Sequence, residues 1–275
     1  MIKSVVENSA ELSLYSDQWY IYQYLLHGSV EAVFCAHRWD LKISVASYHR
    51  LVKKYGIVKS AGRREASLTE LLQFFVQKSL EPTLGIETVY YQKMPASFQT
   101  SLATLHRTYQ NILNSNLGRT ATGLIIHPFQ ERERILVGQE VSTKKRYGKY
   151  AGDFSIPMTF SQDGEKEEMS VLRVLQQEVF TYLAIKGQLA VPSFWKVLDF
   201  EILDVSVSLY EIDLPQNFPN ELISSAKLAN LQFCELDRLA QLGEFRTGVM
   251  EMIENLYCGE SVISNLNKAL LQIPA

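Results

Sequence analysis

Cysteine is scarce in this sequence, which limits the structures that the chain can adopt. The three cysteines, Cys35, Cys234 and Cys258, lie far apart among 275 residues and form no CxxC pair. Zinc sites and disulfide frameworks need closely spaced or paired cysteines, so we expect neither. We interpret all three as buried free thiols of a protein from a reducing compartment.

Long apolar runs are also missing. No segment approaches the roughly 20 apolar residues that a membrane-spanning helix needs. The first residues, MIKSVVENSAELSLYSDQW, lack the continuous apolar core of a signal peptide. The chain has no Walker-type glycine loop, and residue spacing indicates no Ser/His/Asp or Cys/His arrangement. These absences predict a cytoplasmic protein without a membrane partner.

Charge is distributed unevenly along the chain. The sequence is 47% hydrophobic and has 27 basic and 30 acidic residues, for a net charge of -3. Residues 1–119 carry a net charge of +4, with 13 Lys and Arg against 9 Asp and Glu, and residues 120–275 carry -7. A chain of this length and composition is expected to fold as two domains. The asymmetry indicates that only the N-terminal half meets a polyanion.

Residues 1–117 are expected to be helical. The first predicted helix has Asp17 as its cap and ends at Gly28. Two more helices are predicted, from Ser29 to Ala36 and from Ser44 to Gly56. Three short helices with a tight turn before the third are typical of a helix-turn-helix unit. The segment Ile43–Arg50 resembles the recognition helix of bacterial regulators and recombinases, in which a small polar residue comes first and an aromatic residue and Arg follow.

Basic residues gather at this third helix. Seven Lys and Arg, and no acidic residue, lie between Leu41 and Arg64. Clustering of this kind suits phosphate neutralisation, so we expect double-stranded DNA as a partner. The expected groove contacts are Ser44, Ser47, Tyr48 and Arg50. The expected phosphate contacts are Lys53, Lys54, Lys59, Arg63 and Arg64. A solvated basic surface is the alternative interpretation.

A second helical module is predicted to follow the first. Helices are expected over residues 68–80, 86–93 and 101–113. The segment Ser101–Arg107 matches Ser44–Arg50 at four of seven positions, with one further Ser/Thr exchange, at an offset of 57 residues. We therefore predict a possible tandem repeat of residues 17–60 and 67–114. A chance match between two helical segments is the alternative.

From residue 118 the pattern changes to strands alternating with helices. Strands are predicted over 122–127, 134–140, 195–207 and 207–214, and helices over 221–242 and 248–271. Between the second and third of these strands, residues 152–180 indicate a strand, a polar loop and an amphipathic helix. The apolar residues of this helix recur at helical spacing: Val171, Leu172, Leu175 and Val179. Acidic residues precede this helix, where they suit the positive end of its dipole.

This stretch resembles the Nudix box, a family pattern of Gly, five residues, Glu, seven residues, then Arg-Glu-aliphatic-any-Glu-Glu-any-Gly-aliphatic. Glu165, Arg173, Leu175 and Glu178 match the pattern. Departures occur at its two Gly positions (Thr159, Phe180) and two of its Glu positions (Val174, Gln177). Because the order of elements over residues 118–275 also resembles a Nudix domain, the resemblance implies an α/β/α sandwich with a mixed sheet. The expected fold class is therefore α+β in two parts, with an all-α helix-turn-helix region before this domain.

The resemblance implies that Glu165 and Arg173 form a structural ion pair and that Leu175 is a core position. In the family, the Glu residues of the box helix bind divalent cations that bridge a pyrophosphate, and Val174 and Gln177 occupy two of these places. We therefore expect no cofactor and little or no hydrolase activity. The alternative is a Mg or Mn site built off-pattern from Glu165, Glu167, Glu168 and Glu178, with Glu178 and Glu165 as catalytic residues.

A fold without its catalytic ligands can still bind a nucleotide-type small molecule. The expected ligand-binding residues supply positive charge and an aromatic ring near the box: Arg132, Arg134, Lys144, Lys145, Arg146 and Tyr147. Lys149 and Tyr150 extend this set. A solvated connecting loop is the alternative interpretation of residues 142–150.

Three functions follow from these patterns. The first is a DNA-binding regulator whose Nudix-like domain binds a nucleotide-type ligand; it resembles the Nudix-related transcriptional regulators in design, although those carry their DNA-binding part at the C-terminal end. The second is an atypical Nudix hydrolase acting on a nucleoside diphosphate derivative. The third is a protein-interaction scaffold. A homodimer is possible for the first, since proteins that read DNA grooves are commonly two-fold dimers. The alternative is a monomer whose tandem modules read the site.

Overall fold

The computed structural model describes residues 12–60, 86–93, 101–103, 105–106, 119–162, 164–202 and 205–257. These residues fall into two compact units. The first unit combines the described residues up to Ser60 with those from Thr120 onwards, and the second lies between Ala61 and Arg119. Within the second unit, helix α6 (Ile86–Lys93) is where the sequence predicts it. The predicted helix over 68–80 and most of that over 101–113 lie outside the described residues.

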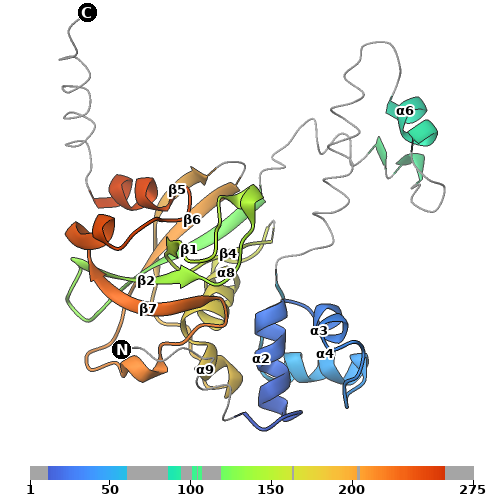
Figure 1. The fold of residues 1–275 in the computed structure, drawn as a ribbon, viewed down its shortest axis with the longest axis horizontal. Helices are drawn as coiled ribbons and strands as arrows, with labels where there is room; N and C mark the ends of the chain where they lie inside the picture. Colours follow the sequence, from blue (N-terminus) through green and yellow to red (C-terminus); the bar gives the residue numbers. More distant parts are fainter. Residues whose placement is uncertain are drawn as a thin grey trace, which may run out of the picture. The chain divides into compact units, whose positions relative to one another are not determined.

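The first unit contains a layered α/β structure (Figure 1). Its strands are β1 (Arg119–His127), β2 (Arg134–Glu140), β3 (Phe154–Ser155), β4 (Met158–Phe160), β5 (Trp195–Ile202), β6 (Val205–Asp213) and β7 (Leu228–Glu235). Its helical elements are α8 (Glu167–Val174), the π-helix η3 (Leu175–Val179), α9 (Thr181–Ile185), the short 3₁₀ turns η2 (Lys145–Tyr147), η4 (Asn220–Leu222) and η5 (Leu236–Gln241), and a helix over residues 249–257.

The strands form two sheets. One has the order β4-β1-β6-β5 and the other β3-β2-β7. Strand β4 is antiparallel to β1, and β5 is antiparallel to β6. Strands β1 and β6 run parallel, because they are neighbours and their C-terminal ends meet where Leu214 N–H donates to His127 O, at 2.9 Å. The four-stranded sheet is therefore mixed, and the expected α+β class is confirmed.

Alternation along the strands places apolar side chains on both faces of the sheets. Leu124 and Ile126 of β1 pack with the helix formed by α8 and η3, whereas Ile125 packs with Val249 and Met252 of the C-terminal helix. One strand therefore contributes to two cores, each covered by a helix. This arrangement gives the α/β/α sandwich that the sequence predicts.

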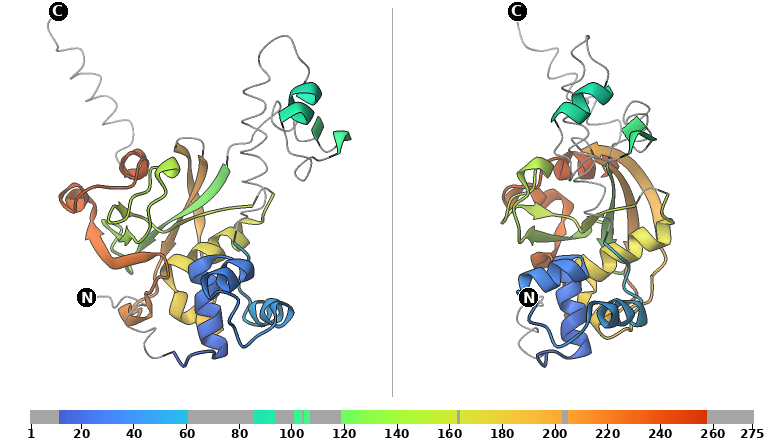
Figure 2. Two further views of the ribbon diagram at one scale, coloured as in Figure 1. Left: turned by 45° about the vertical axis from the view of Figure 1, so that its right-hand side comes forward. Right: turned by 90° about the vertical axis from the view of Figure 1, so that its right-hand side faces the viewer.

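Three helices near the N-terminus form a separate aromatic-rich core. Helices α2 (Asp17–His27), α3 (Val30–Ala36) and α4 (Val45–Lys54) pack around Tyr20, Phe34 and Tyr48, whose rings lie within 6.3 Å of a neighbour in this group. The same core includes Ala184 and Ile185 of α9. In both views of Figure 2 the blue helices α2–α4 lie beside the yellow helices of the sandwich. Burial of this shared apolar surface joins the three helices to the sandwich.

That shared core differs from the division expected at residue 117. Helices α2–α4 belong to the same compact unit as the sandwich, and residues 61–119 are assigned to the second unit. Sequence patterns show which residues are apolar, but not which distant element they pack against. The boundary was therefore placed where the secondary-structure pattern changes, rather than where packing changes.

Several local predictions were wrong. Ser16, rather than Asp17, caps α2, because its hydroxyl accepts from Trp19 N at 3.2 Å. The helix predicted over residues 221–242 is replaced by η4, strand β7 and η5, since pairing with β2 favours extended backbone. Cys35 is exposed rather than buried, whereas Cys234 is buried as expected; Cys258 lies outside the described residues. Among the described helices, none combines the length and hydrophobicity needed to cross a membrane.

Candidate functional site

The loop before the box helix is held to that helix by a buried ion pair. Arg173 is only 1% exposed, and its guanidinium donates to both carboxylate oxygens of Glu165, one of them at 2.7 Å. It also donates to Lys59 O at 2.7 Å and to Phe160 O at 3.2 Å. The ion pair expected between Glu165 and Arg173 is therefore present, and Leu175 is fully buried next to it.

Residues 56–60, which follow α4, run along the box helix. Gln176 donates to Gly56 O and accepts from Val58 N, both at 2.9 Å. Gln177 contacts Ser60 Oγ at 3.3 Å, and Arg173 contacts the backbone of Lys59. We call residues 56–60 the connector. It joins the end of α4 directly to the residues of the box.

The helix widens where the family pattern places its metal-binding carboxylates. Residues 175–179 form the π-helix η3, with Phe180 N donating to Leu175 O at 2.7 Å. Single π turns inside α-helices are frequent at functional sites. Val174 is fully buried in the apolar core, so its position supplies no polar atom. Gln177 and Glu178 are also buried, and both have partners within the protein.

Glu178 lies in a cluster of charged side chains from five segments of the chain. Its carboxylate accepts from Met158 N at 2.6 Å. Glu140, at the end of β2, forms ion pairs with Lys149 and with Arg246, the latter at 3.3 Å. Lys227 donates to the amide oxygen of Gln177. We define Glu140, Lys149, Glu178, Lys227 and Arg246 as the lysine–glutamate cluster.

Burial perturbs the titration of this cluster. It is the main reason that the pKa of Glu178 is raised to about 7, and the negative charge of Glu140 raises it further. Lys149 and Lys227 act in the opposite direction. Burial also lowers the pKa of Lys227 to about 8. The site therefore holds ionisable groups that change charge near neutral pH.

The donors present do not suit a divalent cation. Mg²⁺ needs several oxygen ligands in near-octahedral array, but Val174 offers none, Gln177 Oε1 accepts from Lys227, and a neighbouring ammonium would repel the metal. Glu165, Glu167, Glu168 and Glu178 do not assemble an alternative site: Glu165 is paired with Arg173, and Glu167 and Glu168 are exposed at the other end of the helix. Within the described chain, no group of three or more His, Cys, Asp or Glu side chains is placed to hold a metal ion.

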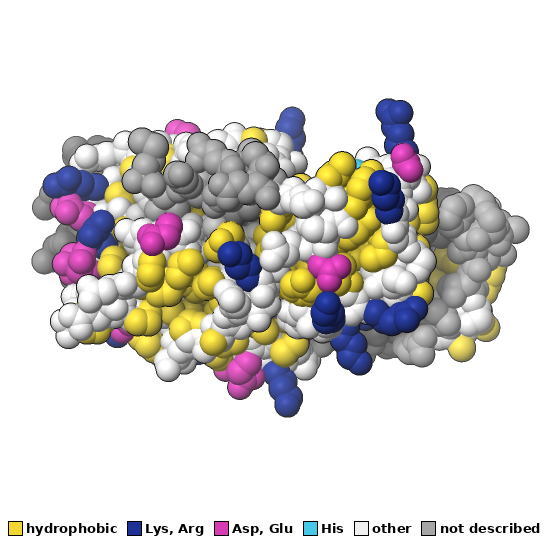
Figure 3. Space-filling model, turned by 90° about the horizontal axis from the view of Figure 1, so that it is seen from below, with side chains coloured by type: hydrophobic (Ala, Val, Ile, Leu, Met, Phe, Trp, Pro, Cys, Tyr) yellow, Lys and Arg dark blue, Asp and Glu magenta, His cyan; other side chains and the backbone are white. Residues whose placement is uncertain are grey.

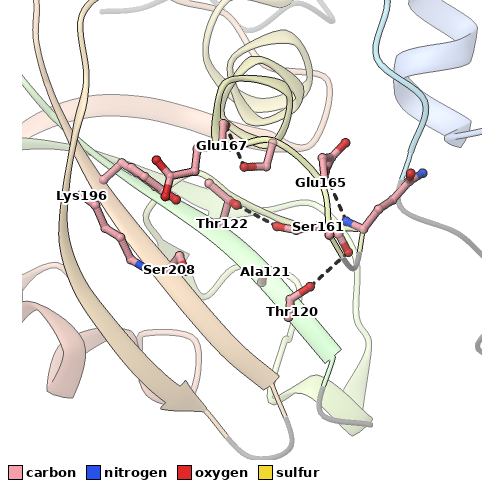
Figure 4. Close-up of a pocket in the computed structure, with 12 residues that line it drawn as sticks. Thr120, Ala121, Thr122, Ser161, Glu165, Glu167, Lys196 and Ser208 are labelled. Atoms are coloured by element: carbon pink, nitrogen blue, oxygen red, sulfur yellow. Dashed lines mark hydrogen bonds between the residues drawn. The ribbon is translucent and has the colours of Figure 1, made fainter. Parts of the chain in front are cut away.

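A polar pocket of about 210 Å³ opens beside the start of the box helix, over the four-stranded sheet (Figure 4). Thr122 and Ser161 share a hydrogen bond of 2.7 Å on its wall. Burial, together with the charge of Glu167, raises the pKa of Tyr210 to about 12. Lys196 is engaged with Asp199 at 2.8 Å. The lining combines hydroxyl groups with the charged side chains of Glu165, Glu167 and Lys196.

The residues predicted to bind a ligand are not brought together. Arg132 and Arg134 lie before and at the start of β2, where they pair with Asp213 at 3.2 Å and Glu131 at 2.6 Å. Lys144, Lys145, Arg146 and Tyr147 follow the other end of that strand, roughly 20 Å away at the usual rise per strand residue. The ring of Tyr147 packs on that of Phe160, with the two ring centroids 5.0 Å apart.

Sequence reasoning missed most of the lysine–glutamate cluster. Lys149 was predicted only as an extension of the ligand-binding set, and Glu140, Lys227 and Arg246 were not selected. The available signal was a charged residue at the end of an apolar strand, as at Glu140 after the β2 run Ile135–Val137 and at Lys227 before Leu228. Such a residue at a strand end is usually solvated, so only the long-range packing distinguishes it.

Helix α4 has a basic outer face. Ala46, His49, Arg50 and Lys53 are exposed at helical spacing, and Ser44 caps the helix by accepting from Ser47 N at 3.1 Å. Lys54 pairs with Asp17 at 3.2 Å, and Lys59 is exposed on the connector. Figure 3 shows Lys and Arg side chains standing out from this part of the surface. Arg63 and Arg64 lie outside the described residues.

Tyr48 was wrongly predicted to face a DNA groove. Its side chain is fully buried, and its hydroxyl donates to Tyr20 O at 2.5 Å. The reason is helical geometry: Tyr48, Leu51 and Val52 lie on one face of α4, and the aromatic core covers that face.

Comparison with known proteins yields similarities in structure only. No protein-family model matches the sequence, and no curated protein matches it. The Nudix domain of Shewanella oneidensis NrtR, solved with ADP ribose, aligns with 56% of this chain and 97% of its own at 11% identity, with a TM-score of 0.37.

Two further solved structures are similar in the same way. A Nudix hydrolase from Nitrosomonas europaea aligns with 51% of this chain and 89% of its own, at 14% identity and a TM-score of 0.36. A MutT/Nudix family protein from Enterococcus faecalis aligns with 65% of this chain and 73% of its own, at 16% identity and a TM-score of 0.39. Because these values are low, any chemistry has to be argued from the residues of this chain.

Proposed function

We propose that this protein is a DNA-binding regulator whose Nudix-like domain binds a nucleotide-type ligand without hydrolysing it. The observation that carries the second part is the box helix itself. It retains the Glu165–Arg173 ion pair that holds its loop, but Val174 is part of the core, and lysines lie beside Glu178. The fold is thus kept while the donors for catalytic metals are replaced.

Helix α4 supports the DNA-binding part. Its outer face presents Arg50 and Lys53 to solvent, and the capped start of the helix presents Ser44. An exposed helix with basic residues on one face fits the major groove of B-DNA, where its side chains reach phosphates and base edges. We include a homodimer in this proposal, and light scattering on the purified chain is its test.

The connector provides a physical link between the two functions. Because residues 56–60 follow α4 and are hydrogen-bonded to Gln176 and Arg173, a shift of the box helix would reposition α4. A ligand then regulates DNA binding if its affinity differs between the two positions of α4.

The DNA-binding surface is tested by the double substitution Arg50→Ala/Lys53→Ala. We expect the affinity for random-sequence duplex DNA to fall by roughly tenfold or more, and the slope of log K against log salt to fall by about 1 to 2, since each lost phosphate contact removes about one unit. Fluorescence anisotropy at several salt concentrations measures both quantities.

The matched control removes the same charge elsewhere. Arg238 and Lys186 are exposed outside α4, so Lys186→Ala/Arg238→Ala should leave DNA binding within about twofold of the original protein. Equal losses in the two double variants, or no loss in the first, would reject α4 as the DNA-binding surface.

The alternative function is an atypical Nudix hydrolase that uses Mg²⁺ or Mn²⁺. It is tested with ADP-ribose, NAD and nucleoside triphosphates as substrates, with either metal or with EDTA. We expect no metal-dependent turnover above background, together with a ligand-induced rise in melting temperature for at least one compound. Turnover that Glu178→Gln abolishes would instead establish the hydrolase.

A stable protein partner captured in the absence of DNA would favour the interaction scaffold.

A further inference from the structure

Two cationic groups of the lysine–glutamate cluster have donors that no carboxylate of the described residues accepts from: the ammonium of Lys227 and the Nε of Arg246. Among the described residues, Lys227 forms no ion pair, and its ammonium group donates to the neutral amide oxygen of Gln177. The Nε of Arg246 is buried and has no hydrogen-bond partner, while its Nη1 contacts Glu140. A buried donor without a partner is costly, so the Nε of Arg246 indicates a missing acceptor. Lys227 is only partly buried, and its ammonium group has further N–H donors besides the one that contacts Gln177.

The charges of the cluster do not balance. Three cations, Lys149, Lys227 and Arg246, surround two carboxylates, and Glu140 is shared by two of the cations. The side chains of Glu140, Lys149 and Arg246 are at most 11% exposed, so solvent screens this surplus poorly. Burial is the largest effect that lowers the pKa of Lys227, and the positive charges of Lys144 and Lys149 lower it further. The negative charges of Glu178 and Glu140 raise it.

We propose that Lys227 and Arg246 of this cluster bind a phosphate group of the ligand directly. Their positive charges take the place of the divalent cations that bridge a pyrophosphate in Nudix enzymes. An ammonium group supplies a point charge and a guanidinium supplies a directed donor, and both bind phosphate well. A phosphate oxygen accepting from Arg246 Nε would satisfy the unpaired donor. This inference rests on the proposed nucleotide binding and specifies its chemistry.

Positive charge also lies on the route to the cluster. Lys144 and Lys145 are exposed on the loop that leads to Lys149. Thr247 N donates to Gly148 O at 3.0 Å, which joins this loop to the segment that carries Arg246. These exposed lysines lie on the same loop as Lys149, where their charge would attract an anion towards the cluster.

Inorganic pyrophosphate is the probe for this site. Isothermal titration calorimetry on the full-length chain in EDTA should show binding, and added Mg²⁺ should not strengthen it. Lys227→Met should weaken binding by roughly tenfold to a hundredfold, as expected for the loss of a charged hydrogen bond. Lys227→Arg, which keeps the charge, should retain most of the affinity. Acetate, which presents a smaller charge, should not compete.

The control is Lys186→Met, which removes an exposed lysine and should bind pyrophosphate like the original chain. Binding that requires Mg²⁺, or equal affinity in Lys227→Met and the original chain, would overturn the inference. The DNA titration is run on the same preparations. If pyrophosphate binding fails while DNA binding persists, the proposed phosphate site is wrong and the DNA-binding surface on α4 is retained. If DNA binding fails while metal-free pyrophosphate binding persists, the DNA-binding surface is wrong and the phosphate site is retained.

Discussion

Replacing Arg173 with Ala should destabilise the protein by about 3 to 5 kcal/mol, the usual cost of removing one partner from a buried ion pair. The side chain is 1% exposed and satisfies the carboxylate of Glu165 as well as the carbonyls of Lys59 and Phe160. Its loss removes the cation that pairs with the Glu165 carboxylate, which keeps a hydrogen bond from Gln162 N at 3.2 Å, and it removes one donor from each of the carbonyls of Lys59 and Phe160. The box loop and the connector would lose their common attachment.

Urea unfolding at neutral pH measures this effect. Arg238→Ala is the control, because Arg238 also pairs with a glutamate, Glu235 at 2.7 Å, but its side chain is 65% exposed. An exposed pair contributes about 0 to 1 kcal/mol. If Arg173→Ala also cost less than about 1 kcal/mol, the ion pair would not be what holds the loop to the helix.

Glu178→Gln should make the protein more stable at neutral pH than the original chain. Burial raises the pKa of Glu178 from 4.5 to about 7 in the folded state, so ionisation opposes folding. The stability associated with the protonated carboxyl is fully present below pH 4.5 and is lost as the pH rises through 7. The advantage of the variant should therefore grow over this window, to at most about 3 kcal/mol.

Urea unfolding at pH 5, 6 and 7 tests the prediction below the pH at which Lys227 begins to lose its proton. The amide of Gln can still accept from Met158 N, so the local hydrogen bond is preserved. Glu168→Gln, an exposed substitution on α8, should show no comparable dependence on pH. A Glu178→Gln variant that is destabilised equally at all three pH values would show that Glu178 stays ionised in the folded protein.

The Glu165–Arg173 pair shows what local pattern can reveal. Seven residues lie between these two positions, both belong to one loop and helix, and the resemblance of this short stretch to a family pattern implied the contact that the structure contains. The helix starts predicted at Ser29 and Ser44 also followed from local pattern, and in the structure both serines cap their helices. Strands β1, β2, β5 and β6 also followed from local alternation and apolar runs. In each case the deciding interaction lies within one element or at its end.

Tyr48, β7 and the lysine–glutamate cluster show where local pattern fails. Tyr48 resembles an exposed recognition-helix residue until α2 and α3 cover it, and residues 228–235 become a strand only because β2 offers a partner. Lys149 lies well before Glu178 in the sequence and Lys227 lies well after it, so no short spacing links the three residues.

The sequence by itself therefore determined the short spacing of Glu165 and Arg173 and the apolar and amide side chains at Val174 and Gln177, because those properties depend on residue type and position alone. Only the tertiary structure decided which side chains surround these positions. The pairing of charges across long sequence separations depends on how the two sheets and the helix of residues 167–179 pack. That packing sets the burial of Glu178, the contact of the Lys227 ammonium with Gln177 and the contact of Arg173 with the segment that follows α4.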